Sequence, residues 1–137
     1  MRPDRYTVPI KGFKMNYYKV TLEMARTKDF PEGSSKRGYH LVVPLDDSDH
    51  LDEAGWRAEK KKCTVHRFWE GEDDEHGHLI HTRHRTWAFS YKPGEDDDEP
   101  LFHLESHRIR PGEYISIREH DGETLPFLIA EVRPISD

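Results

Sequence analysis

The chain has 137 residues and a mass of 16.2 kDa, which is the size of one domain and too small for two. Apolar residues make up 34% of the sequence and charged residues 35%, so a lean core must lie under a heavily charged surface. The aromatic residues argue against disorder, and no apolar run approaches the ~20 residues of a membrane span or forms a secretory signal. Cys63 is the single cysteine, which excludes an internal disulfide and favours a reducing compartment, so we expect a cytoplasmic protein.

The formal net charge of −6 hides an uneven distribution of acidic residues. Three acidic runs, over 46–53, 70–75 and 95–99, hold 15 of the 27 acids and leave 12 against 21 Lys and Arg elsewhere. Such runs are typical of solvated loop tips that keep a protein soluble. None has the alternating oxygen ligands, central glycine and terminal glutamate of an EF-hand, which argues against calcium. The ten histidines make the charge depend strongly on pH, and we expect minimal solubility near pH ~6.

The first part of the chain predicts a lead-in followed by strands. Residues 1–14 show no periodicity and indicate a loosely ordered lead-in to a single β-rich domain over 15–137. Apolar and polar residues alternate over 18–24, which predicts a half-buried strand. We expect a loop over 27–38 and a short β-branched strand over 39–43.

One short helix is predicted over residues 49–61. Apolar residues recur at roughly helical spacing from Leu51 to Ala58, with acidic residues early and lysines late, as the helix dipole favours. We expect Ser48 or Asp49 to cap the first turn.

The remainder of the chain is predicted to be β. Two arms, over 62–69 and 78–91, flank an acidic turn, and the second arm is long enough for a bulge. Further strands are predicted over 101–110, 113–119 and 125–132, separated by Pro-Gly and Asp-Gly turns. The sequence therefore predicts a mainly β, single-domain fold, a small antiparallel β barrel or sandwich of six to seven strands with one short helix.

A metal site is the first candidate for chemistry. On the strand expected after residue 100, His103, Glu105 and His107 share one face, and two imidazoles with a carboxylate can ligate Zn²⁺ or Fe²⁺. Neighbours on one face stand about 6–7 Å apart, so a metal bridges two of them easily and all three only with help. His78 and His84 share a face of the preceding arm and are expected to complete the site. The alternative is a polar strand face turned to solvent.

A ligand or nucleic-acid face is the second candidate. Four residues of the arm over 78–91 alternate onto one side: Arg83, Arg85, Trp87 and Phe89. Guanidinium groups beside aromatic rings are what single-stranded nucleic acid needs, and Arg67 with the lysines at 60–62 would extend the positive surface. The same aromatic residues are equally suited to the core, and the acidic turn beside them would repel phosphate. Nucleic acid is therefore the less favoured partner.

Cys63 is the third candidate, because the lysines at 60–62 would lower the pKa of its thiol. The spacing identifies no base, and free cysteines are most often buried small hydrophobes. The sequence also lacks a Gly-rich phosphate loop, a nucleophile elbow and paired-cysteine metal sites.

These observations favour a non-catalytic binding or interaction module over an enzyme. We expect its partner to be a protein or a small ligand, and the chain to be a monomer or a homodimer away from membranes. Two alternatives stay open. One is a metal-binding protein or metalloenzyme holding Zn or Fe at the His/Glu strand site, and the other is a single-stranded nucleic-acid binder.

Overall fold

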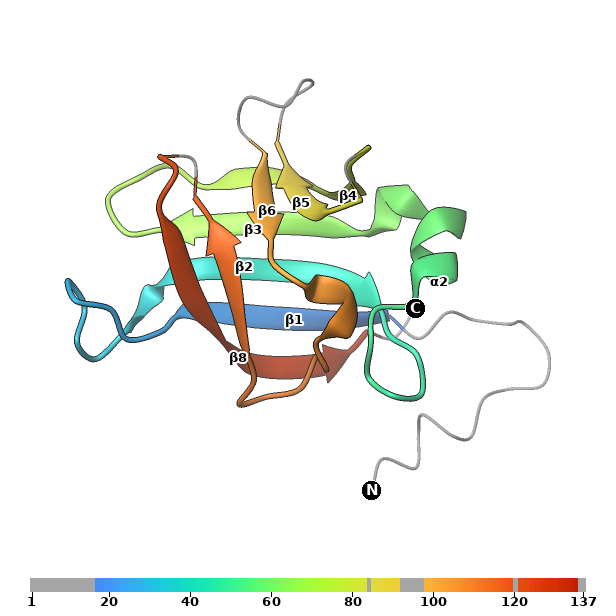
Figure 1. Ribbon diagram of the computed structural model, residues 1–137, viewed down its shortest axis with the longest axis horizontal. Helices are drawn as coiled ribbons and strands as arrows, with labels where there is room; N and C mark the ends of the chain where they lie inside the picture. Colours follow the sequence, from blue (N-terminus) through green and yellow to red (C-terminus); the bar gives the residue numbers. More distant parts are fainter. Residues whose placement is uncertain (1–16, 84, 92–97, 120, 136–137) are drawn as a thin grey trace.

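The computed structural model describes residues 17–83, 85–91, 98–119 and 121–135. These residues form one closed antiparallel β-barrel of eight strands in chain order, with β8 closing on β1 (Figure 1). The strands are β1 (Tyr17–Met24), β2 (Ser34–Pro44), β3 (Thr64–Trp69), β4 (Glu75–His81), β5 (Trp87–Ser90), β6 (Glu99–Leu101), β7 (Tyr114–Arg118) and β8 (Thr124–Pro134). The mainly β, single-domain barrel is confirmed, with one or two strands more than expected. The expected lead-in at 1–14 lies outside the described residues.

The additional strand arises because the arm expected over 78–91 is two strands rather than one. A tight turn after β4 is closed by a 2.8 Å hydrogen bond from the amide of Thr82 to the carbonyl of Thr86. The two threonine hydroxyls also lie 2.8 Å apart, and Arg85 adopts a positive φ of 64°. This turn contains neither glycine nor proline, so the sequence carries none of the usual signals for it.

The predicted helix is shorter than expected and has a different cap. Helix α2 (Glu53–Ala58) is followed by a 3₁₀ turn, η1 (Lys60–Lys62). Asp52 caps α2 by accepting a 3.0 Å hydrogen bond from the amide of Gly55, so Ser48 and Asp49 do not serve as caps. The indole of Trp56 donates to the carbonyl of Leu79, which fixes α2 against β4.

The prediction of a strand over 101–110 is wrong beyond its first residue. Strand β6 ends at Leu101, where its single residue pair with β7 joins it to Ile117. His103 then takes a left-handed conformation with φ 57°, and η2 (Leu104–Ser106) follows. The buried side chains of Leu104 and Ile109 close one end of the barrel.

Strand β2 begins at Ser34, earlier than expected, and passes close to β1 at Gly38. A Cβ on Gly38 would lie 1.9 Å from the carbonyl oxygen of Leu22, so only glycine fits there. The pairing of β1 with β2 shifts register beside this point, between Glu23 and Met24.

The barrel interior has three levels. In the middle, the ring of Tyr39 contacts those of Phe89 and Phe127, with centroids 4.9 and 5.2 Å apart. The end beneath η2 is apolar and nearly filled, with a residual space of about 10 Å³. The opposite end, at the left of Figure 1, contains buried charged side chains and is open.

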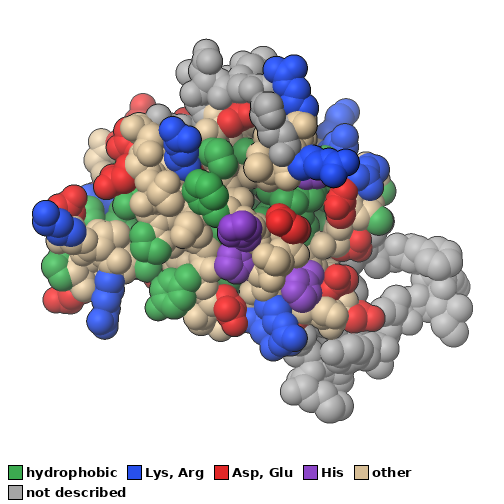
Figure 2. Space-filling view, in the orientation of Figure 1, with side chains coloured by type: hydrophobic (Ala, Val, Ile, Leu, Met, Phe, Trp, Pro, Cys, Tyr) green, Lys and Arg blue, Asp and Glu red, His purple; other side chains and the backbone are tan. Residues whose placement is uncertain are grey.

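The outer surface carries charges of both signs. Figure 2 shows acidic and basic side chains interspersed on one face, with apolar and histidine side chains between them. No helix in the described part of the chain has the length and apolar character needed to span a membrane.

Candidate functional site: the barrel-end pocket

A cavity of about 580 Å³ opens at the polar end of the barrel. It lies between the β1–β2 connection, the β3–β4 turn and the β7–β8 turn, and we call it the barrel-end pocket. Arg67 and Glu119 line its inner part and are both buried, whereas Asp121 and Glu123 are exposed at its rim. The rings of Phe30 and Trp69 contribute apolar wall.

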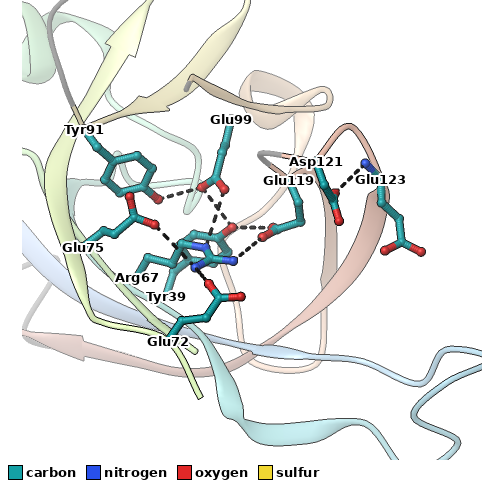
Figure 3. A network of polar contacts seen from close by, with 9 residues as sticks. All are labelled: Tyr39, Arg67, Glu72, Glu75, Tyr91, Glu99, Glu119, Asp121 and Glu123. Atoms are coloured by element: carbon teal, nitrogen blue, oxygen red, sulfur yellow. Dashed lines mark hydrogen bonds and ion pairs between the residues drawn. The ribbon is translucent and has the colours of Figure 1, made fainter. Parts of the chain in front are cut away.

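Arg67 is the centre of the polar network at the base of the pocket (Figure 3). Its side chain points inward from β3, and the residue is 4% exposed. Nη2 donates to Glu119 Oε1 at 3.0 Å and Nη1 to Glu72 Oε1 at 2.9 Å, while Glu75 lies 3.5 Å from Nη1. Its Nε lies 3.6 Å from Glu99 Oε2, beyond a hydrogen bond. Four carboxyl groups from three segments of the chain therefore surround one guanidinium.

Two tyrosine hydroxyls connect the buried carboxyl groups. The hydroxyl of Tyr39 contacts Glu119 and lies 3.1 Å from Glu99 Oε1, and Tyr91 donates to the same Glu99 oxygen at 2.6 Å. Burial raises the pKa of Tyr39, and the charges of Glu119 and Glu99 raise it further. Burial, followed by the charge of Glu99, raises the pKa of Tyr91 in the same way. Both hydroxyls consequently keep their protons at neutral pH and serve as donors.

The guanidinium of Arg67 stays charged in this network. Burial lowers its pKa, but the hydrogen bonds that it donates to Glu72 and Glu119, together with the charge of Glu119, outweigh burial and raise the pKa above its ordinary value. The guanidinium also lies 4.2 Å from the centroid of the Trp69 ring. Contacts on several sides thus fix both Arg67 and the pocket-facing carboxyl group of Glu119.

The sequence interpretation of the acidic runs is wrong for residues that build this network. Glu75 and Glu99 belong to runs expected to be solvated loop tips, yet both turn toward Arg67, and Glu99 is fully buried. Glu72 also pairs with Arg67, but its side chain is 55% exposed on the β3–β4 turn, as expected for a loop tip. Arg67 itself was expected on a positive outer surface and is buried inside. One signal was available: Arg67 lies on the same face of its strand as Val65, which is buried in the core.

The structure does not support the basis of the predicted metal site. His103, Glu105 and His107 do not share a strand face, because His103 is left-handed and Glu105 lies in η2. His78 is exposed on β4, and His84 lies outside the described residues. Within residues 17–83, 85–91, 98–119 and 121–135, no group of three or more His, Cys, Asp and Glu side chains is arranged to hold a metal ion. Ligation of Zn or Fe there stays an untested prediction.

The predicted ligand or nucleic-acid face is not formed as expected. Trp87 and Phe89 are 2% and 0% exposed, so their rings fill the core and cannot stack with bases. Arg83 and Arg85 lie exposed in the turn before β5. A shallow cleft of about 500 Å³ beside α2 is lined by Arg85, Trp87 and Glu105, among others. Trp87 exposes almost none of its surface there.

Cys63 is fully buried, as the hydrophobic interpretation of this residue implied. Burial raises the pKa of its thiol to about 11, and Glu59 contributes to the same effect. The neighbouring lysines therefore do not activate it.

Three histidines that the sequence interpretation did not group lie side by side on the outer wall. His40, His66 and His76 are opposite one another on β2, β3 and β4, with ring centroids 5.5 and 4.6 Å apart. Burial lowers the pKa of His40, and nearby Lys19 and His66 lower it further. The alternation of residues along these strands was the available signal, but it required the strand register.

The fold and the pocket define this chain as an antiparallel β-barrel with one open, polar end. Comparisons with protein-family models, with curated proteins and with solved structures found no match.

Proposed function

We propose that this protein is a non-catalytic binding module that holds a small ligand in the barrel-end pocket. The observation that supports this proposal is the coexistence of an open cavity of about 580 Å³ with buried polar groups already fixed around it. Small-molecule sites in proteins have volumes of about 300–1,000 Å³ and combine apolar walls with a few oriented polar groups.

Preorganisation strengthens the argument. Arg67 and Glu119 are bonded to each other at 3.0 Å, and Tyr39 contacts Glu119 from the other side. A ligand that contacts Glu119 therefore meets a side chain whose conformational freedom is already restricted, which lowers the entropic cost of binding.

The single buried thiol suits a reducing compartment, so we propose a cytoplasmic location.

The proposal is tested by narrowing the mouth of the pocket. Lys28 is exposed and lines the pocket, so Lys28→Trp should obstruct entry without altering the core. Lys61→Trp, in η1 near the opposite end of the barrel, is the matched control. Ligand-detected NMR against a set of small cationic, neutral and anionic aromatic compounds should give binders that Lys28→Trp loses and Lys61→Trp retains. Equal binding by both variants, or no binder at all, would contradict the proposal.

A further inference from the structure

We infer that the ligand of the barrel-end pocket is an organic cation, an ammonium or guanidinium group carried on an apolar body. This inference rests on the proposed function and adds the chemical class of the ligand.

The first support is the balance of charge around the cavity. Three basic residues line it, Lys28, Arg37 and Arg67, against six acidic residues: Asp29, Glu70, Glu72, Glu119, Asp121 and Glu123. Both arginines are already paired, Arg67 with Glu119 and Glu72 as described above, and Arg37 with Glu70 at 3.1 Å. The described lining therefore has an excess of acidic groups.

The rim carries that excess. Asp121 and Glu123 stand together on the β7–β8 turn, where Asp121 accepts a 2.9 Å hydrogen bond from the amide of Glu123 (Figure 3). Within the described residues, neither side chain forms an ion pair with a basic group. Arg118 projects from an outward-facing position of β7, and its Nη2 lies 4.0 Å from the place that a Cβ on Gly122 would take. Its guanidinium is therefore beside this turn but pairs with neither carboxylate. A cation at the mouth would thus meet two carboxylates.

The base of the pocket offers acceptors more readily than donors. The terminal nitrogens of Arg67 donate to Glu119, Glu72 and Glu75, which uses three of its five N–H groups. Its Nε lies beside buried Glu99. An anion that approached Arg67 would lie next to these carboxylates, which would repel it. A cation instead extends the same network, because charged donors form strong hydrogen bonds with carboxylates.

The aromatic wall is suited to a cation with an apolar body. Trp69 has the guanidinium of Arg67 at 4.2 Å from its centroid, and Phe30 has that of Arg37 at 4.4 Å. Each of the two rings therefore already forms a cation–π contact with an arginine of this chain. An aromatic or aliphatic body would pack against the remaining ring surface and against Leu125 and Met24, which also line the cavity.

The inference is tested by calorimetric titration with three probes of one shape. Benzylammonium, benzyl alcohol and benzoate differ mainly in charge, and we expect benzylammonium to bind at least about tenfold more tightly than the other two at low salt. The variant Asp121→Asn/Glu123→Gln should weaken benzylammonium several-fold. The control Glu113→Gln/Glu131→Gln removes two exposed acids away from the pocket, with the same change in net charge, and should retain the affinity.

Each other outcome has a definite meaning. Tighter binding of benzoate, or equal weakening by the two double variants, would overturn the cationic class. If benzoate or benzyl alcohol binds best and Lys28→Trp abolishes that binding, the pocket proposal stands and only the class is wrong. If none of the probes binds, the cationic class is overturned, and the broader Lys28→Trp screen then decides the pocket proposal separately.

Discussion

The two ends of this barrel are built from the same strands and differ in almost every other respect. At the closed end, inward side chains such as Val20, Leu41 and Ile115 pack beneath η2 and leave a space of about 10 Å³. At the open end, the same alternation places Arg67 and Glu119 inside, at a cavity of about 580 Å³, with buried Glu99 behind Arg67. The aromatic layer at Tyr39 separates the two environments.

Polar contacts also join the segments that cover the closed end of the barrel. Asp49 is fully buried there, its carbonyl accepts from the amide of Ile109 at 2.7 Å, and its carboxylate pairs with Arg110 at 2.5 Å. The bridge between Leu45 and Leu51 adds a second tie. The open end has no comparable cover among the described residues. The difference indicates that the closed end stabilises the fold by apolar burial and one covered ion pair, whereas the open end has several charged groups beside a cavity and is suited to recognition.

The largest expected effect is at the open end, where Arg67→Met leaves buried Glu99 and Glu119 without their cation. We expect a loss of about 3–5 kcal/mol in the free energy of unfolding, measured by urea denaturation. Adding Glu99→Gln and Glu119→Gln should recover much of that loss, because it removes the unpaired charges. A loss below about 1 kcal/mol in the single variant would show that the network is not coupled to folding.

At the closed end, Leu104→Ala should lower the free energy of unfolding by about 3 kcal/mol, through lost burial and a new cavity. Ligand affinity at the open end should not change, because the aromatic layer lies between. Leu104→Met is the matched control, with a cost below about 1.5 kcal/mol. Weaker ligand binding in a folded Leu104→Ala protein would show that the two ends are not independent.

The two tyrosines of the polar network should make the protein less stable in alkaline solution. The pKa values of Tyr39 and Tyr91 are raised in the folded state, so their contribution to stability is present below pH ~10 and is lost as pH rises above that of an unfolded tyrosine. At pH 11, each of these two tyrosines should lower the free energy of unfolding by about 1.4 kcal/mol. Tyr91→Phe should therefore lose less stability than the parent between pH 9 and pH 11, in chemical denaturation at each pH. Equal losses would contradict the assigned protonation state.

Thiol labelling should have the smallest effect on stability, and it measures directly how accessible a cysteine side chain is to solvent. Cys63 is fully buried and its pKa is about 11, so at pH ~8 it should react with a disulfide reagent more than about 100-fold slower than in the unfolded chain. In a Cys63→Ala background, Glu123→Cys at the pocket rim should react nearly as fast as an unfolded thiol. Rapid labelling of Cys63 in the native protein would mean that this region opens readily.

The parts of the fold that follow alternation or turn signals were predictable, and the site was not. Strict alternation from Tyr18 identified β1, and Asp121-Gly122 identified the last hairpin. The turn between β4 and β5 has no glycine or proline, and the left-handed residue at His103 is not encoded by an obvious pattern, so two strands were misjudged. That misjudgement also produced the incorrect His103–His107 strand face.

The site escaped prediction for a different reason. Arg67, Glu99 and Glu119 are 20 to 52 residues apart in sequence and belong to three different strands or strand ends. Only the closure of the barrel brings them together. The sequence shows how many acids the chain has, but the strand register decides which of them turn inward.

The three tryptophans provide the most direct test of the account. Trp69 lines the open pocket, whereas Trp56 and Trp87 contact each other near α2, with centroids 4.8 Å apart. In a ¹⁵N NMR titration with benzylammonium, the account predicts a saturable shift of the Trp69 indole signal while the Trp56 and Trp87 signals stay in place. An unchanged Trp69 signal, or shifts confined to Trp56 and Trp87, would contradict it.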